Sequence, residues 1–251
     1  MLAGGYATRL YPLTKYVPKP LLPVDGIPII DYIIEKIENL GSIERIIVSA
    51  NSKFEEQFHS WLQKHTANQN IELEIEKSEG DWNKPGAIGA LSSIWKKHPS
   101  DDYLVVAGDN LFTDTLSEFL SFYLARRATS VALYPNDSQQ SADNFGSVEI
   151  NSEGRIVKFV EKPVSASTRG SLIATSIYLI PAGDMKRTDK YISEGNNTDS
   201  PGYFIQWLSS KHNVYGYQLK GRWWDIGTID SYNSVKELKL PAYTRSGSAA
   251  A

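Results

Sequence analysis

The residues best suited to chemistry begin at position 4, where two glycines are followed by two spaced cations. Because Gly4 and Gly5 lack a Cβ, their backbone N–H groups can approach phosphate oxygens, and Arg9 offers a bidentate clamp for the same oxygens. Lys19 is a second cation, held between two prolines that stiffen its loop. The stretch therefore predicts a phosphate-binding loop rather than a turn with solvated charges.

Several familiar catalytic patterns are absent from the sequence. It contains neither GxGxxG nor GxxxxGK[ST], so the dinucleotide fingerprint and the Walker loop are not satisfied. Cysteine is absent, which excludes disulfides, thiolate nucleophiles and cysteine zinc sites. The four histidines have no HExxH spacing, so we give no role to His59, His65, His98 and His212 and expect them on solvated surfaces.

Two aspartates are candidate metal ligands. Asp109 follows the apolar run at 104–107, which places its carboxylate at the carboxyl end of a predicted buried strand, where open α/β sheets bind ligands. Asp225 follows two tryptophans and precedes Gly227, in a stiff apolar turn. Carboxylate oxygens are the hard ligands that Mg²⁺ prefers. The alternative for each aspartate is a helix or turn cap.

The stretch from residue 4 to residue 20 resembles the pattern GGxxTRLxPxTxxxPKP of the nucleoside-diphosphate-sugar pyrophosphorylase family, the sugar-1-phosphate nucleotidyltransferases, including glucose-1-phosphate thymidylyltransferases. Four later blocks resemble this family in the same order. They are the base and ribose loop at 85–91, the metal-binding turn at 107–110, the sugar-phosphate clamp at 161–163 and the second metal-binding turn at 224–228. The resemblance covers residues 1 to about 240.

The resemblance implies a role for each matching residue. Arg9 and the glycine pair would hold the β- and γ-phosphates, Lys19 would lie near the reacting α-phosphate, and Lys162 would hold the sugar phosphate, which makes these cations the catalytic residues. The implied nucleotide-binding residues are Leu2, Ala3, Gly4, Gly5, Thr8, Glu76 and Gly86. The implied sugar-phosphate-binding residues are Gly146, Glu161, Lys162, Thr175 and Ser176, and the implied Mg²⁺ ligands are Asp109 and Asp225.

The implied reaction joins a nucleoside triphosphate to a sugar 1-phosphate, giving a nucleotide sugar and pyrophosphate (EC 2.7.7 class), with Mg²⁺ as cofactor. The expected pair is glucose 1-phosphate with dTTP or UTP. A mannose-1-phosphate guanylyltransferase and a catalytically silent regulatory subunit of the same fold remain alternatives. Glu76 could accept from guanine or from a thymine or uracil imide, so it leaves the base open. Glu161-Lys162-Pro163 disfavours cytidylyl transfer to a non-sugar phosphate such as phosphocholine.

Alternating helices and strands must position these residues. Pro28, apolar residues at helical spacing and Gly41 predict a helix over 28–41. Further helices are predicted at 54–64, 87–97, 203–211 and 229–238, and Thr228 is the predicted cap of the last. Strands are predicted at 45–50, 71–75, 103–107, 131–134, 147–150, 156–160, 172–180 and 214–219. A hairpin turn is predicted at 151–154. This order predicts an α/β, three-layer Rossmann-like nucleotidyltransferase fold: a mostly parallel mixed sheet, helices on both faces and a smaller sugar-binding lobe.

We find no internal repeat or low-complexity linker, so we expect one domain over residues 1–245. It would comprise a nucleotide-binding lobe (1–112), a sugar-phosphate-binding lobe (113–220) and a second metal-binding turn with the C-terminal helix (221–245), followed by a disordered tail at 246–251. The first strand, at 1–3, is shorter than the usual ~5 residues, as a truncated strand would be. Some relatives add a C-terminal β-helical acyltransferase domain, an activity that we do not expect here.

Charge and hydropathy limit the partners. A formal net charge of −3 gives no general attraction to nucleic acid, and apolar runs fall short of the roughly 20 residues that span a bilayer. The opening residues have no signal-peptide pattern. We therefore expect a cytoplasmic protein whose partners are a nucleoside triphosphate and a sugar 1-phosphate, with no membrane and no nucleic acid; whether it forms a homo-oligomer stays open.

Overall fold

The computed structural model describes residues 1–65, 71–76, 86–136, 144–164 and 171–238. Its N-terminal part is built on a parallel sheet in the order β1-β4-β5. The three strands are β1 (Leu2–Ala3), β4 (Ile46–Asn51) and β5 (Ile71–Glu76). A parallel bridge between Leu2 and Ala107 connects this sheet to the end of β6 (Tyr103–Val106).

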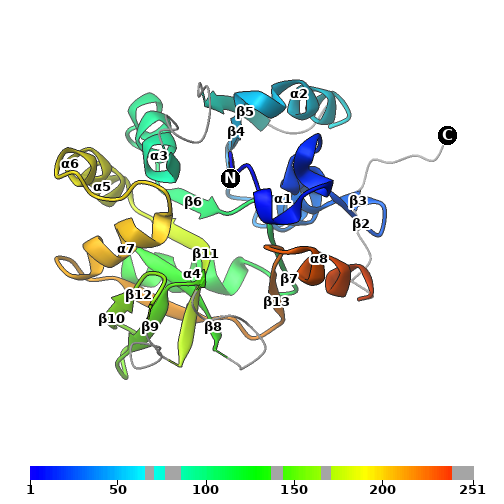
Figure 1. Ribbon diagram of the computed structural model, residues 1–251. Helices are drawn as coiled ribbons and strands as arrows, with labels where there is room; N and C mark the ends of the chain where they lie inside the picture. Colours follow the sequence, from blue (N-terminus) through cyan, green and yellow to red (C-terminus); the bar gives the residue numbers. More distant parts are fainter. Residues whose placement is uncertain (66–70, 77–85, 137–143, 165–170, 239–251) are drawn as a thin grey trace.

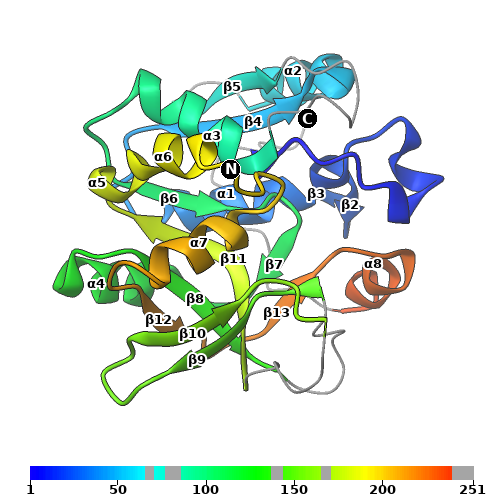
Figure 2. The ribbon, with the colours of Figure 1, turned by 60° about the vertical axis from the view of Figure 1, so that its left-hand side comes forward.

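The second sheet has the order β10-β9-β11-β8-β12, with β6 paired to β11. Its strands are β8 (Ser130–Pro135), β9 (Ser147–Ile150), β10 (Ile156–Val160), β11 (Leu172–Ile180) and β12 (Tyr215–Gln218). Strand β11 is antiparallel to β6, β8 and β9, whereas β12 is parallel to β8. Figure 2 shows β4 and β5 at the top, β8, β9 and β10 at the bottom, and β6 between them.

Helices cover both faces of the sheets, because neighbouring strand residues point into different cores. Val105 belongs to one core cluster and Val106 to the other, and Val131 and Ala132 divide in the same way. The first core receives side chains from α1 (Ile29–Glu38), α2 (Glu55–Gln63), α4 (Ser117–Arg126) and α8 (Ile229–Lys236). The second receives them from α3 (Gly86–Lys97), α5 (Ala182–Met185), α6 (Arg187–Ser193) and α7 (Pro201–Ser209), which group together in Figure 1.

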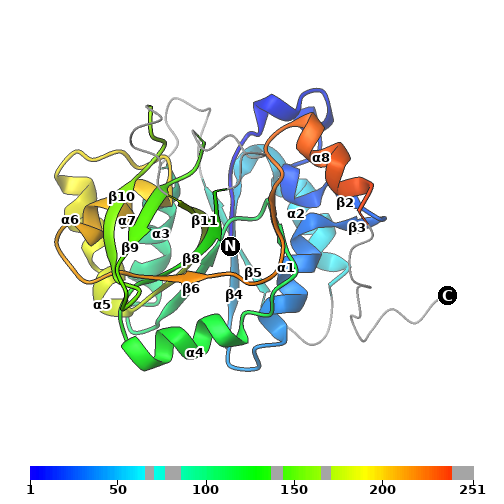
Figure 3. The ribbon, with the colours of Figure 1, turned by 90° about the horizontal axis from the view of Figure 1, so that it is seen from below.

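Short elements complete the described chain. Antiparallel pairs form between β2 (Pro23–Val24) and β3 (Ile27–Pro28) and between β7 (Asn110–Phe112) and β13 (Trp223–Asp225). Figure 3 shows α8 beside the N-terminal segment, where the hydroxyl of Tyr232 donates to the carbonyl of Pro23 over 2.6 Å. In the described part of the chain, 3₁₀ turns lie at Thr8–Leu10, Leu13–Lys15, Lys19–Leu21 and Ser52–Phe54.

The sequence predictions of the main elements are confirmed. Strands at 147–150, 156–160 and 172–180 have the predicted bounds, and the helix predicted from Pro28 is α1. Thr228 caps α8 in a capping box with Ser231, as its position predicted. The mixed α/β fold with helices on both faces is confirmed as well. Its parallel pairing, however, is concentrated in β1-β4-β5, so "mostly parallel" does not describe the second sheet.

Other features differ from the sequence predictions. No helix was predicted at α4, α5 or α6. His65 is not on a solvated surface: its side chain is 7% exposed, and Nε2 lies 2.9 Å from Oδ1 of Asp31. The end of the predicted domain at 245 and the predicted tail at 246–251 lie outside the described residues. Within the described part of the chain, no helix is long and apolar enough to cross a membrane.

Candidate active site

The two candidate metal ligands converge in the fold. Asp225 ends β13 and pairs in register with Asn110, the first residue of β7, so it faces the residue next to Asp109. The backbone N–H of Ile226 also donates to the carbonyl of Asp109 over 3.1 Å. Residues separated by more than a hundred positions are therefore fixed side by side, as the sequence predicted.

Two cations lie next to this pair of carboxylates. Nζ of Lys19 is 2.5 Å from Oδ2 of Asp109, and both side chains are largely buried. Arg9 is close to the second turn, since a Cβ built on Gly227 would lie 3.6 Å from Nη2 of Arg9 and 2.6 Å from Oδ2 of Asp225. Removal from water, together with the negative charge of Asp109, raises the pKa of Asp225 to about 7, against the opposing effect of Lys19 and Arg9.

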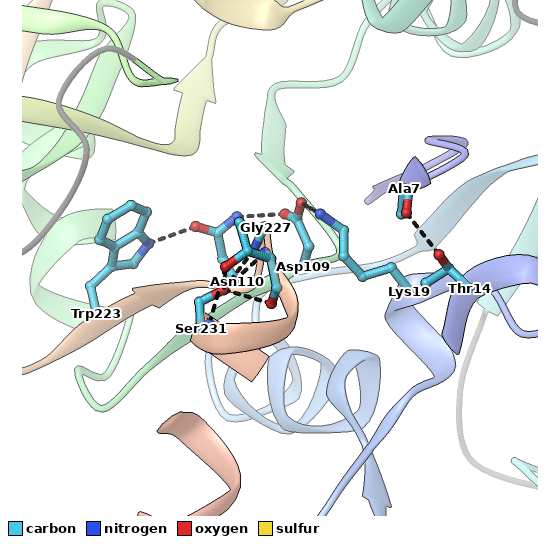
Figure 4. A network of polar contacts seen from close by, with 9 residues as sticks. Ala7, Thr14, Lys19, Asp109, Asn110, Trp223, Gly227 and Ser231 are labelled. Carbon is cyan, nitrogen blue, oxygen red and sulfur yellow. Dashed lines mark hydrogen bonds and ion pairs between the residues drawn. The ribbon is translucent and has the colours of Figure 1, made fainter. Parts of the chain in front are cut away.

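The orientation of Asp109 is set by a chain of buried hydrogen bonds, shown in Figure 4. Nδ2 of Asn110 donates to Oδ1 of Asp109 over 2.8 Å, and Oδ1 of Asn110 accepts from the indole N–H of Trp223 over 2.6 Å. Asn110 and Trp223 are each only 2% exposed. Lys19 contacts the other carboxylate oxygen, so both oxygens of Asp109 are held in place.

These residues fit a divalent cation. Burial disfavours the charged form of Asp225, the charge of Asp109 adds to this, and a dication would offset both effects. Among the described residues, no group of three or more His, Cys, Asp or Glu side chains could hold a metal. A cation held by Asp109 and Asp225 would take its other ligands from a phosphate and from water, which is the usual mode for Mg²⁺.

The N-terminal loop is held by its own contacts. Thr14, which is fully buried, donates its hydroxyl to the carbonyl of Ala7 over 2.7 Å, as Figure 4 also shows. Ala7 has a left-handed backbone, with φ of 49°, just before the turn that carries Thr8 and Arg9. Thr8, Arg9 and Gly5 are exposed, so the predicted phosphate-binding groups face solvent.

The remaining predicted nucleotide residues lie at the carboxyl edge of the parallel sheet. Leu2 and Ala3 form β1, and the carbonyl of Leu2 accepts the N–H of Gly108 over 2.9 Å. Gly4 lies against the carboxylate of Glu76, the last residue of β5. Gly86 begins α3; Pro85, the other part of the predicted base loop that precedes it, lies outside the described residues.

Gly86 is required by the backbone on which it lies. Its φ of +70° is in the left-handed region, and a Cβ there would come within 2.4 Å of the carbonyl oxygen of Thr198. The same carbonyl accepts the N–H of Ile88 over 3.0 Å. The segment before α7 therefore packs directly on the start of α3, where the predicted base and ribose loop lies.

Glu161 is enclosed by small and polar neighbours. Its Oε1 accepts from the hydroxyl of Ser200 over 2.7 Å, and a Cβ built on Gly202 would lie 2.0 Å from its Oε2. A Cβ on Gly146 would lie 2.8 Å from the same oxygen. Burial raises the pKa of Glu161, although the Ser200 hydrogen bond and the charge of Lys162 oppose this. A carboxylate with such neighbours is suited to hydrogen-bonding a polyol.

The other predicted sugar residues divide into two groups. Lys162 is exposed, has a left-handed φ of 48°, and lies 5.8 Å from the ring centre of Tyr203. Ser176 also has a left-handed φ, 59°, within the irregular part of β11. Thr175 does not fit its predicted role, because its side chain is fully buried and its hydroxyl donates to the carbonyl of Ala132.

Sequence reasoning gave no role to several residues that shape the site. Asn110 was seen only as part of a motif, and Ser200 and Gly202 were not considered. The signal that could have found the latter pair is the sequence Ser-Pro-Gly at 200–202, because Ser200 caps α7 and Pro201 opens it. No local pattern links Trp223 to Asn110, since their contact spans 113 residues.

Comparison with known proteins assigns the chain to a family. Residues 1–240 match the family model described as nucleotidyl transferase. The chain belongs to that family.

Curated relatives include the bifunctional protein GlmU of Methanococcus maripaludis (strain C7), which is 29% identical over 90% of this chain and 50% of its own length. The UTP–glucose-1-phosphate uridylyltransferase of Synechocystis is 26% identical over 96% of this chain and 65% of its own length. The chain spans about half the length of the first GlmU relatives that it matches.

Solved structures agree with this assignment at the level of the fold. A Bacillus anthracis protein described as a candidate glucose-1-phosphate thymidylyltransferase, in complex with sucrose, has a TM-score of 0.79, 23% identity and 96% coverage of both chains. A UDP-glucose pyrophosphorylase complexed with UDP-glucose has a TM-score of 0.78 and 19% identity, covering 94% of this chain and 95% of its own. The three-layer nucleotidyltransferase fold is therefore shown.

Proposed function

We propose that this protein is a Mg²⁺-dependent sugar-1-phosphate nucleotidyltransferase, which makes a nucleotide sugar and pyrophosphate from a nucleoside triphosphate and a sugar 1-phosphate. The observation that carries the proposal is the cluster formed by Lys19, Asp109, Asp225 and Arg9, at the edge where the two sheets meet. It combines two cations for phosphate with two carboxylates for a metal, and no cysteine nucleophile exists in the sequence. Direct transfer between two phosphates depends on positioning the reactants and neutralising their charge, and this arrangement is suited to both.

The residues divide the work between the two substrates. Arg9 and the backbone of Gly4 and Gly5 bind the β- and γ-phosphates, where charge grows as pyrophosphate leaves. Lys19 is held in place by Asp109 and lies beside the α-phosphate. Lys162 binds the phosphate of the sugar, while the enclosed carboxylate of Glu161 accepts hydrogen bonds from the sugar hydroxyls. The sugar-phosphate oxygen is already ionised at neutral pH, so no general base is needed.

Asp109 and Asp225 are the residues that would hold the cation. When bound there, Mg²⁺ would supply charge neutralisation between the two polyanions. Asn110 keeps the Asp109 carboxylate in the orientation that this requires.

Finer assignments belong to the proposal as well. The relative named as a UTP–glucose-1-phosphate uridylyltransferase makes a sugar phosphate the expected acceptor, and the resemblance in the sequence adds glucose 1-phosphate with dTTP or UTP as the first pair to test. A mannose-1-phosphate guanylyltransferase is the alternative. We place the protein in the cytoplasm, where such substrates are made.

Pyrophosphate release measures the activity directly. Six sugar 1-phosphates are tested against the five common nucleoside triphosphates, with and without Mg²⁺. We expect release from one or a few pairs, and only with a divalent cation. Pyrophosphate release that does not depend on sugar phosphate would contradict sugar-nucleotide synthesis. If correctly folded protein releases no pyrophosphate with any substrate pair, the result would support a regulatory subunit instead.

A further inference from the structure

Glu76 lies directly on the nucleotide loop. A Cβ built on Gly4 would come within 2.5 Å of Oε1 and 3.0 Å of Oε2 of Glu76, so both carboxylate oxygens rest over the glycine backbone. Any larger residue at position 4 would displace that carboxylate. Glu76 is also the last residue of β5, at the carboxyl edge where parallel sheets bind their ligands.

The carboxylate is held as a hydrogen-bond acceptor. The hydroxyl of Ser49, on the neighbouring strand β4, donates to Oε1 over 2.6 Å. Ser49 is fully buried, so this contact is fixed by the core of the sheet rather than by solvent.

A carboxylate does not suit every nucleobase equally. Guanine carries two adjacent donors, N1–H and the 2-amino group, which match the two oxygens of a carboxylate. Uracil and thymine offer one donor, N3–H, between two carbonyl oxygens that repel a carboxylate. Adenine and cytosine each place a ring-nitrogen acceptor beside the amino donor, so they also present one attraction and one repulsion.

We propose that Glu76 selects guanine, so that the nucleotide substrate of this protein is GTP. The proposal rests on the function proposed above and specifies its base, in favour of the guanylyltransferase alternative over dTTP or UTP. Glutamine at the same position would offer one donor and one acceptor, the pattern that complements a uracil or thymine imide. The acidic side chain is therefore the specificity-determining feature.

Equilibrium binding tests the base without requiring turnover. Calorimetry with Mg²⁺ and no sugar phosphate compares GTP, ITP, UTP and dTTP on the wild-type protein. We expect GTP to bind about 10–100-fold more tightly than UTP or dTTP, the range that one good bidentate contact gives. ITP, which lacks the 2-amino group, should fall between them. Equal or tighter binding of UTP or dTTP would overturn the proposal.

The variant Glu76→Gln tests whether this side chain is responsible. Its affinity for GTP should fall about 10–100-fold, while its affinity for UTP should hold or rise. The matched control is Glu74→Gln, the same change two residues earlier on β5, where the carboxylate is bound to Lys97 at the surface. The control should leave every affinity unchanged. A uniform loss for all four nucleotides in Glu76→Gln, with an unchanged melting temperature, would assign Glu76 a role other than base selection.

Measurements of turnover distinguish the proposal that Glu76 selects guanine from the proposal that the protein is a sugar-1-phosphate nucleotidyltransferase. Pyrophosphate release that is fastest with UTP or dTTP would keep the nucleotidyltransferase function and reject guanine. Absence of release from every substrate pair would reject the general function, and the calorimetric order of the four nucleotides would still decide the base.

Discussion

The side-chain amide of Asn110 donates to Oδ1 of Asp109, on the opposite side of that carboxylate from Lys19. Asn110 is in turn held by the buried indole of Trp223. The orientation of the proposed metal ligand is thus determined from within the hydrophobic core, and this relationship gives the first prediction.

Replacing Asn110 by alanine should weaken the metal site more than the substrate sites. Loss of such an outer contact typically costs about 10–100-fold in metal affinity or activity. We therefore expect the Mg²⁺ concentration for half-maximal pyrophosphate release to rise by that factor. Trp223→Phe, which keeps the amide contact to Asp109, should give a smaller shift. An unchanged Mg²⁺ titration in Asn110→Ala, at saturating substrates, would argue against the positioning role.

Asp109 and Asp225 should behave as one unit. If they hold the same cation, Asp109→Asn and Asp225→Asn should each abolish most activity, and the double variant should lose little more than either single variant. Since Asp109 helps to raise the pKa of Asp225, Asp109→Asn should also lower that pKa in the metal-free protein, which NMR titration of the carboxyl can measure. Fully additive losses, or full activity in EDTA, would show that the pair does not share an ion.

Lys162→Ala should affect the two substrates differently. Its proposed contact is with the sugar phosphate alone, so the KM for sugar 1-phosphate should rise more than the KM for the nucleotide. Isothermal binding of each substrate gives the same comparison without turnover. Lys158→Ala is a suitable control, because Lys158 is on β10, the strand that precedes Lys162, and pairs with Glu149 at the surface. Equal weakening of both substrates would remove Lys162 from the sugar site.

Glu161 should make stability depend on pH. Burial raises its pKa in the folded protein, so between the unfolded pKa, about 4.3, and the folded pKa the folded state binds more protons. The protonated Glu161 side chain therefore contributes its full stabilisation of the folded state below about pH 4. This stabilisation is lost as the pH rises through the folded pKa of Glu161. Glu161→Gln removes this titration, so the melting temperature of the variant relative to wild type should be higher at pH 8 than at pH 4. If the melting temperatures of the variant and the wild type differ by the same amount at pH 4 and pH 8, burial of the charged Glu161 does not destabilise the folded protein.

The elements with strong periodicity were predictable from the sequence. The helix α1 was found because isoleucines recur on one face between Pro28 and Gly41, and β11 because its apolar run is long and bounded. Helix α4 was not found. Its aromatic and aliphatic residues extend around the helix, and only Phe119 and Tyr123 are buried, so the sequence shows no clear apolar stripe.

The site was predictable where a residue acts through a motif and unpredictable where it acts through packing. The proximity of Asp109 and Asp225 followed from strand ends and from the family pattern. Thr175 was misjudged because alternation along a strand decides which neighbour faces the sheet interior, and β11 is irregular between Ala174 and Tyr178. The metal, the base and the sugar assignments remain predictions.

The narrow connection between the two sheets has an evolutionary consequence. The nucleotide loop belongs to β1-β4-β5, Glu161 and Lys162 follow β10, and the strands of the two sheets meet at the bridge between Leu2 and Ala107. The two candidate substrate sites nevertheless touch at one further point, because Thr198 packs on Gly86 only two residues before Ser200, which holds Glu161. Under the proposed function, a lineage that changes the sugar it accepts by moving Ser200 would therefore also have to adjust the start of α3.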